Sequence, residues 1–89
     1  MKEIILDSTA LASRDAFHDA MAEALSFPDW YGRNLDALHD LLTALPEDTH
    51  LVFRNWAQAE AALGNYANGI RKALTHASGR NPRLTVEFR

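Results

Sequence analysis

Acidic and hydroxyl-bearing side chains recur at helical spacing between residues 36 and 43. Asp36, Asp40 and Thr43 are separated by four and then three residues, so a helix would place them on one face, with His39 beside them. Such a face could accept charge-assisted hydrogen bonds from arginine, in the manner of a phosphate. Asp36 and Asp40 repel each other at this spacing, and Asp is unfavourable in a helix interior. A pair that lowers local stability is a candidate for function.

The same residues allow three other interpretations, of which the plainest is a solvated helix face. Asp36, His39 and Asp40 could in principle hold a divalent metal ion, but the pattern is short and no established metal motif supports it. Acid–base catalysis would need a nucleophile, and Ser26 and Thr43 lack the glycines of a nucleophile elbow. We therefore expect no metal, no cofactor and no enzyme active site.

Two adjacent aromatic residues, Trp30 and Tyr31, precede the acidic segment in a polar stretch that also holds Gly32. Pro28 ends the preceding helix because it cannot continue the hydrogen-bond ladder, and Asn34 is a favourable cap for the next one. Large aromatic side chains in a polar loop are typical of anchors in protein interfaces. We expect both rings to be exposed in the free protein and the segment to bind a protein partner.

The hydrophobic pattern predicts the elements that position this segment. Predicted strands cover residues 2–6, 49–54 and 83–88, and predicted helices cover about residues 14–25, 35–45, 56–63 and a segment that ends near residue 78. The inner stripe of the second helix is Leu35, Leu38, Leu41, Leu42 and Leu45. Strands that alternate with helices imply crossover connections. The sequence therefore predicts an α/β fold with a small three-stranded parallel sheet and about four helices.

Local signals set the expected ends of the helices. Ser13 and Asn55 are predicted to cap the first and third helices, and Gly64 to end the third in the left-handed conformation. The start of the last helix stays open, because Asn65 and the Asn68-Gly69 pair both offer breaks.

The aromatic and histidine residues outside the acidic segment have simpler interpretations. Phe53 and Trp56 are expected in the core. The four histidines are His18, His39, His50 and His76. Because they are scattered along the chain, each is expected to be a surface side chain rather than a switch or ligand.

Composition limits the classes of function. The 89 residues suit a single domain, 1–89, and the net charge of −3 argues against nucleic acid as the main ligand and for a basic partner. There is no cysteine, so disulfides and thiolate chemistry are excluded. No stretch matches a signal peptide or approaches the roughly 20 apolar residues of a membrane span, which predicts a cytoplasmic protein without membrane contact.

Residues 25–43, LSFPDWYGRNLDALHDLLT, resemble the signature segment of the barstar family, intracellular inhibitors of the ribonuclease barnase. The shared pattern is P-x-aromatic-Y-G-x-N-L-D-A-L-x-D-x-L-T, and the order of strands and helices also matches. The resemblance implies an inhibitor that plugs a nuclease active site. In it, Asp40 would occupy the position of the substrate phosphate, Asp36 would pair with an arginine at the rim, and Trp30 would pack near the catalytic histidine.

The resemblance also implies a full set of partner-binding positions and some departures from the family pattern. These positions are Trp30, Tyr31, Gly32, Asn34, Leu35, Asp36, His39, Asp40, Thr43, Leu45 and His76. His39 and Leu45 stand where the family usually has tryptophan, and His76 stands at an acidic contact. Arg33 adds positive charge inside the expected interface. These departures favour a cognate nuclease that differs from barnase.

The leading hypothesis is a cytoplasmic bacterial ribonuclease inhibitor of the immunity or antitoxin type. Its partner would be a basic secreted or toxin ribonuclease, bound in a 1:1 complex by a chain that is monomeric when free. The alternative is a protein-interaction module of the same fold that binds a basic partner without nuclease activity. A small metal-dependent or acid–base enzyme is the third hypothesis.

Overall fold

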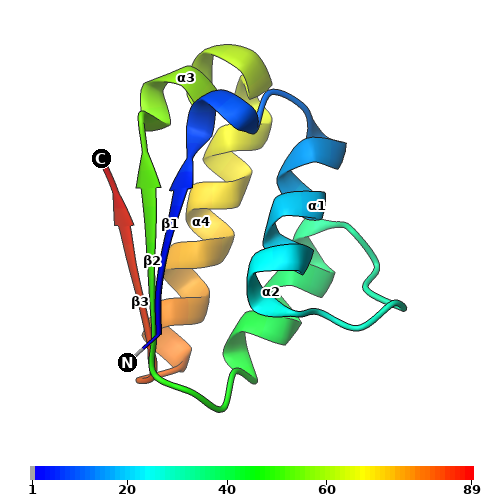
Figure 1. Ribbon diagram of the computed structural model, residues 1–89, viewed down its shortest axis with the longest axis vertical. Coiled ribbons are helices and arrows are strands. Elements are labelled where there is room, and N and C mark those ends of the chain that lie inside the picture. Colours follow the sequence, from blue (N-terminus) through cyan, green and yellow to red (C-terminus); the bar gives the residue numbers. More distant parts are fainter. Residues whose placement is uncertain (1) are drawn as a thin grey trace.

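The computed structural model describes residues 2–89 (Figure 1). In chain order its elements are β1 (Lys2–Asp7), a 3-10 turn η1 (Ser8–Ala10), α1 (Arg14–Leu25), α2 (Leu35–Thr43), β2 (Thr49–Arg54), α3 (Trp56–Leu63), α4 (Asn65–Arg80) and β3 (Leu84–Phe88). Within these residues the predicted α/β fold, with three strands and four α-helices, is confirmed.

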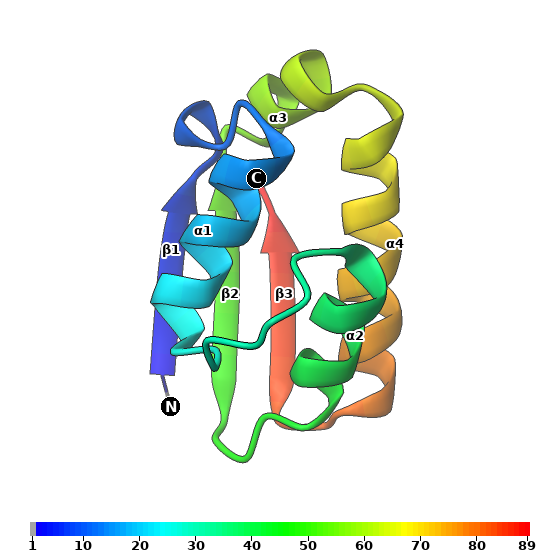
Figure 2. The same cartoon turned by 90° about the vertical axis from the view of Figure 1, so that its right-hand side faces the viewer.

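The strands form one sheet in the order β1-β2-β3, and both pairs are parallel. In this register Leu51 of β2 lies opposite Ile4 of β1 on one side and Val86 of β3 on the other. Parallel strands cannot be joined by a tight turn, so α1 and α2 connect β1 to β2, and α3 and α4 connect β2 to β3. Figures 1 and 2 show α1, α2 and α4 covering one face of the sheet.

The core lies between that face of the sheet and the helices. Its largest fully buried apolar side chains include Phe17, Met21, Leu38, Leu42, Leu51, Phe53, Ile70 and Leu74. Burying each of them contributes about 1.5–3 kcal/mol. Trp56 is also buried, with its ring 5.5 Å from that of Phe53, so the expectation for these two aromatics is confirmed. The middle of α2 is therefore anchored in the core, which fixes the orientation of its outer face.

The ends of α1 follow the sequence signals. Ser13 caps the helix, because its hydroxyl accepts a hydrogen bond of 3.1 Å from the backbone N–H of Ala16. The helix ends at Ser26, which has φ 55° and ψ 46° and donates its backbone N–H to the carbonyl of Ala22. This left-handed residue turns the chain out of α1 and starts the loop that leads to α2.

Helix α3 covers the predicted residues 56–63, but the predicted conformations of its two capping residues were wrong. Asn55 precedes α3 but makes no side-chain cap; its amide instead donates to Asp7 Oδ1 at 3.2 Å and ties the start of α3 to the end of β1. Gly64 has φ 58° and ψ −131°, a positive φ outside the left-handed helical region. This conformation is open to glycine and lets α4 begin at the next residue.

Helix α4 runs without a break through Asn68 and Gly69 and ends at Arg80, two residues beyond the predicted end. Gly69 allows α4 to approach α2 closely, because a Cβ atom there would lie 2.8 Å from Leu35 Cδ1. Close packing against α2 thus accounts for a glycine that local propensity interprets as a break. No helix within residues 2–89 combines the length and apolar character needed to cross a membrane.

Candidate interaction face

The start of α2 is fixed by Asn34 and Gly32. The side-chain oxygen of Asn34 accepts a hydrogen bond of 2.8 Å from the backbone N–H of Ala37, which confirms the predicted cap. The amide group of Asn34 donates to the carbonyl of Gly32 at 3.2 Å. A Cβ atom at Gly32 would lie 3.2 Å from Ala37 Cβ, closer than ordinary van der Waals contact. Glycine at this position therefore lets the loop lie close against the first turn of α2.

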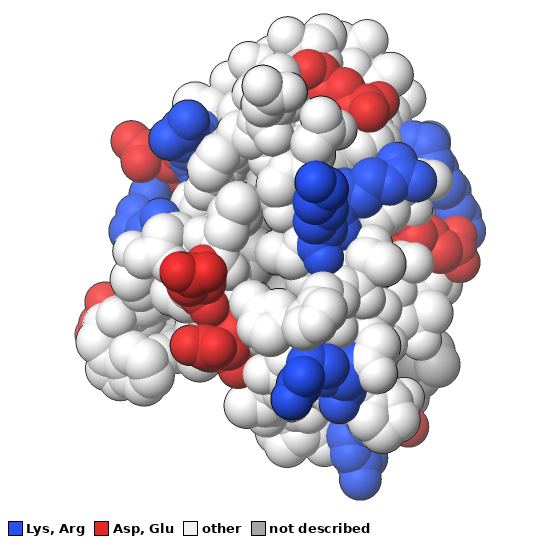
Figure 3. Space-filling model, turned by 180° about the vertical axis from the view of Figure 1, so that it is seen from behind, with Lys and Arg blue, Asp and Glu red and all other residues white. Residues whose placement is uncertain are grey.

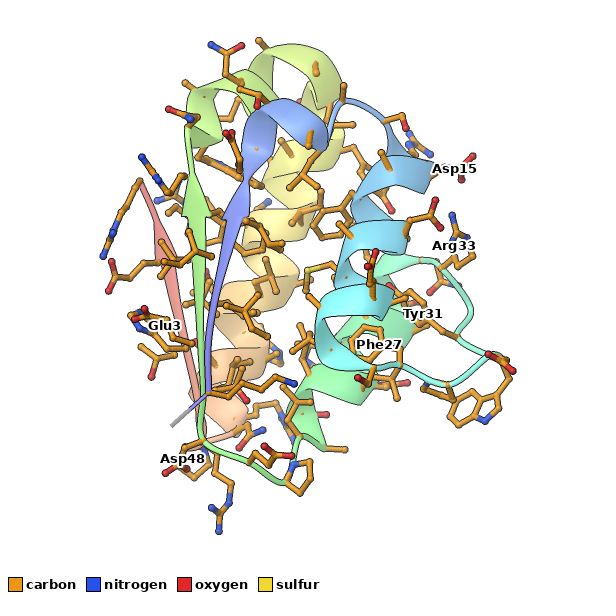
Figure 4. The ribbon with its side chains drawn as sticks, viewed as in Figure 1. Glu3, Asp15, Phe27, Tyr31, Arg33 and Asp48 are labelled. Atoms are coloured by element: carbon orange, nitrogen blue, oxygen red, sulfur yellow. The ribbon has the colours of Figure 1, made fainter. Side chains whose placement is uncertain are left out.

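Arg33 fastens the same loop to α1. Its backbone has φ 55°, which turns its side chain toward α1 (Figure 4). The guanidinium group donates to the carboxylate of Asp19 and to the carbonyl oxygen of Asp15 at 3.2 Å. The hydrogen bond to Asp19 raises the pKa of Arg33. The positive charge that Arg33 brings to the expected interface is thus paired with two aspartates of α1, Asp15 and Asp19.

Tyr31 is buried, with 6% of its surface exposed, so the expectation that both loop aromatics are exposed was wrong for this residue. Its hydroxyl hydrogen-bonds to Nδ1 of His18, and its ring lies 4.8 Å from that of Phe27 (Figure 4). The other nitrogen of His18, Nε2, is 2.7 Å from the hydroxyl of Tyr66. These contacts link the loop to both α1 and α4.

His18 is correspondingly a core residue, with 1% exposure, and not the surface histidine that the sequence suggested. Burial lowers its pKa, and the positive charge of Arg33 adds to that effect. Burial also raises the pKa of Tyr31 to about 12, with a further contribution from Tyr66. His18 is therefore neutral near pH 7, so one tyrosine hydroxyl donates to the ring and the other accepts from it.

Trp30, in contrast, is 76% exposed and is the most exposed large hydrophobic side chain of the described residues. Together with Tyr31, Gly32, Ala37, Asp40 and Leu41, it lines a shallow hollow between the loop and α2. The structure thus places Trp30 and Asp40 at the same hollow. An exposed indole beside a carboxylate gives an apolar and an anionic contact at adjacent points.

The two aspartates of α2 are exposed on its outer face. Asp36 forms no ion pair within residues 2–89, and neither does Asp40 with any lysine or arginine of that range; Nδ1 of His39 lies 3.8 Å from Asp40 Oδ1. The side chain of Asp40 is 84% exposed. Because no lysine or arginine of this part of the chain neutralises them, both carboxylates are available to a partner.

The other predicted site residues of α2 have contacts inside the chain. The Thr43 hydroxyl donates to the carbonyl oxygen of Asp40 at 2.9 Å, and Leu45 is half-buried against the core. Asn81, which the sequence analysis did not single out, donates from its amide to the carbonyl oxygens of Leu42 at 2.9 Å and Leu45 at 3.3 Å. It thus contacts one carbonyl in the last turn of α2 and one just beyond the helix, and its only sequence signal was its place before Pro82.

A second hollow lies between α2 and α4. It is lined by Leu35, Asp36, His39, Lys72, Ala73 and His76. Across it, Nε2 of His39 lies 2.7 Å from Nδ1 of His76, although the two residues are 37 positions apart. The structure thus brings three predicted site residues of α2 together with His76 of α4. It adds Lys72, which the sequence analysis missed because nothing local marks it as adjacent to α2. We call the exposed surface of Trp30, Asp36, His39, Asp40 and His76 the interaction face.

Helix α4 gives this side of the molecule a mixed charge. Its charged residues are Arg71, Lys72 and Arg80, with no aspartate or glutamate over its 16 residues. Lys72 and Arg80 form no ion pair within residues 2–89. Figure 3 shows acidic and basic side chains lying next to each other when the molecule is seen from behind.

Known proteins that are similar to this chain indicate its family. The family model described as "Barstar (barnase inhibitor)" matches residues 1–89, the whole chain. The chain belongs to the barstar family. It is also 37% identical over 78 residues to "Putative ribonuclease inhibitor YrdF" of Bacillus subtilis (strain 168), a match that covers 86% of each chain. Membership of the barstar family supports a ribonuclease-inhibitor-like role, a non-catalytic protein and a ribonuclease as the kind of partner.

The departures from the barstar pattern are clarified by their positions. His39 and His76, which the resemblance places at a tryptophan position and an acidic position, are in direct contact in the structure. They therefore form one local feature of this chain rather than two separate changes. Leu45, the third departure, is half-buried and packs against the core.

Proposed function

We propose that this chain inhibits a ribonuclease by placing the outer face of α2 and the preceding loop in the nuclease active site. The observation that carries the proposal is the pair of exposed carboxylates, Asp36 and Asp40, on a helix whose opposite side is anchored in the core. Asp40 would take the position of a substrate phosphate and accept hydrogen bonds from the basic catalytic groups of the nuclease. Asp36, one turn earlier, would pair with an arginine at the rim of that site.

The rigidity of the loop supports this role. Arg33, Asn34 and the buried hydroxyl of Tyr31 fasten it at three points, to α1, to α2 and to His18. A segment that already has its bound conformation loses less conformational entropy on association. Tyr31 would act by holding Trp30 and Gly32 in place, since its own side chain is buried. Trp30 would supply the apolar anchor beside Asp40.

The positive charge of α4 restricts which ribonucleases could bind this face. Lys72 and Arg80 would repel a partner whose basic groups extend beyond the active site. The partner would therefore combine a cationic active site, facing Asp36 and Asp40, with acidic side chains at the edge that faces α4. This differs from a uniformly basic target and accords with the change from an acidic residue to His76. We place the inhibitor in the cytoplasm as an immunity or antitoxin protein that binds its nuclease 1:1.

The same charge pattern favours the second candidate function, an interaction module for a partner without nuclease activity. The two candidate functions are distinguished by isolating the protein that the chain captures from its own host and assaying that protein for RNA cleavage. We expect an active ribonuclease whose cleavage stops when one equivalent of the chain is added. Capture of a basic protein that does not cleave RNA, by a surface that depends on Asp40, would favour the alternative.

A further inference from the structure

The contact between His39 and His76 is a pair of imidazole rings supplied by two different helices. Nε2 of His39 and Nδ1 of His76 are 2.7 Å apart, the ring centroids are 4.8 Å apart, and the ring planes are inclined by 32°. The His39 side chain is 26% exposed and His76 is exposed, so both rings are open to solvent at the edge of the hollow between α2 and α4.

Two neutral imidazole nitrogens that face each other can share a proton or share a metal ion. Zn²⁺ binds imidazole nitrogen at about 2.0–2.1 Å, so two nitrogens on one ion are separated by about 2.9–3.4 Å, depending on the coordination angle. The nitrogens of His39 and His76 would have to separate by a few tenths of an ångström, and the two rings, whose nitrogens now point at each other, would have to turn so that both lone pairs converge on the ion. Rotation of two solvent-accessible side chains can supply that movement.

The surroundings of the pair contribute both a favourable and an unfavourable charge. Asp40 Oδ1 lies 3.8 Å from Nδ1 of His39, the nitrogen that does not face His76. This distance is too long for a hydrogen bond, but the negative charge of Asp40 favours a cation held by the neighbouring ring. Lys72 lines the same hollow, and its ammonium group opposes a bound cation.

We propose that His39 and His76 form a binding site for a divalent transition-metal ion of the Zn²⁺ or Ni²⁺ class, which links α2 to α4. Imidazole nitrogen suits these ions, whereas Mg²⁺ and Ca²⁺ prefer oxygen ligands. Within residues 2–89 no group of three His, Cys, Asp or Glu residues is arranged to hold a metal ion, so the remaining positions are filled by water. The ion is therefore exchangeable. The proposal concerns the free protein and does not depend on ribonuclease inhibition.

His50 provides a control of the same residue type. His50 lies between Glu3, 3.4 Å from its Nδ1, and Glu87, 2.9 Å from its Nε2. Its two nitrogens face different carboxylates on opposite sides of the ring, so these three groups do not converge on one point. His50→Gln is therefore expected to leave metal binding unchanged.

The test is titration of the untagged, chelator-treated chain with ZnCl₂ and, separately, NiCl₂, with calorimetry and thermal unfolding as readouts. We expect one ion per chain and a rise in Tm of several degrees at saturation, reversed by a chelator and absent with MgCl₂. His39→Gln and His76→Gln should each weaken binding by roughly tenfold or more, since even changes to outer partners of a metal ligand have effects of that size. Two-dimensional NMR should show the imidazole signals of His39 and His76 shifting together.

Lys72→Gln changes the same hollow without removing a ligand, and we expect it to bind the ion at least as tightly as the wild type. The metal-free Tm of each variant shows whether its fold is intact. The proposal is overturned if neither ion raises the Tm of the wild type. It is also overturned if His50→Gln or Lys72→Gln reduces the affinity as much as His39→Gln does.

Discussion

The buried hydroxyl of Tyr31 gives a prediction that tests how the loop is held. Tyr31→Phe keeps the ring in place and removes only the oxygen that hydrogen-bonds to Nδ1 of His18. Because Tyr31 and His18 are 6% and 1% exposed, water has little access to the nitrogen that loses its partner. A buried polar atom left without a partner lowers stability by about 1–3 kcal/mol, so we expect a loss of about 2 kcal/mol.

That loss is large for a chain of this size. At roughly 0.05–0.15 kcal/mol per residue, 89 residues give a free energy of unfolding of about 4–13 kcal/mol. With the urea dependence typical of small proteins, a loss of 2 kcal/mol lowers the midpoint by about 1 M without changing the slope. Urea unfolding followed by far-ultraviolet circular dichroism measures both quantities.

Tyr66→Phe is the matched control, because Tyr66 contacts the other nitrogen of the same ring at 2.7 Å but is itself only partly buried. Water can replace its hydroxyl more readily, and we expect a loss of about 1 kcal/mol or less. The explanation of the loop is refuted if Tyr31→Phe lowers stability by less than about 0.5 kcal/mol, or by less than Tyr66→Phe does.

Three further predictions concern helix α4, pH and the exposed tryptophan. Gly79→Ala should raise stability by up to about 1 kcal/mol in urea unfolding, because a Cβ atom there meets no other atom. Gly69→Ala should raise stability less, because its Cβ atom would displace the Leu35 side chain. An equal gain in the two variants would contradict the close packing of α4 against α2. The folded pKa of His18 lies below its ordinary value of 6.5, so the unfolded chain binds the proton first, and stability should fall as the pH drops below about 6.5. His18→Gln should make stability depend less on pH between pH 7 and 5. An unchanged pH dependence of stability would contradict the lowered pKa of His18. Trp30→Ala should change stability by less than about 0.5 kcal/mol yet weaken ribonuclease binding by about 2 kcal/mol or more in calorimetry; equal binding would remove Trp30 as an anchor.

Patterns that act over a few residues were sufficient to predict much of the fold. The parallel strands followed from short apolar segments separated by helical ones, and the caps Ser13 and Asn34 followed from side chains that reach backbone only three residues away. The outer face of α2 was predictable for the same reason, since helical periodicity alone places Asp36 and Asp40 opposite the buried leucines.

Features that depend on contacts between distant segments could not be predicted. Tyr31 is buried because His18, 13 residues earlier, offers its hydroxyl a partner, and a sequence of aromatic residues in a polar loop does not contain that information. The start of α4 was left open between Asn65 and the Asn68-Gly69 pair, and local sequence could not show that the helix begins at Asn65 and packs Gly69 against Leu35 of another helix. The contact between His39 and His76 joins residues 37 positions apart, so each histidine alone looks like an ordinary surface side chain.

The most direct test of the central claim is titration of the ribonuclease that the chain captures from its own host, with RNA cleavage as the readout. We expect inhibition with an endpoint at one equivalent, and Asp40→Ala should weaken it by at least about 2 kcal/mol, roughly 30-fold, because the basic groups of the nuclease lose their buried partner. Asp48→Ala is the matched control, an exposed aspartate whose contact in the described chain is Arg83 at 3.4 Å, and it should inhibit like the wild type. Inhibition by Asp40→Ala as tight as that of the wild type, or no inhibition by the wild type, would contradict the claim.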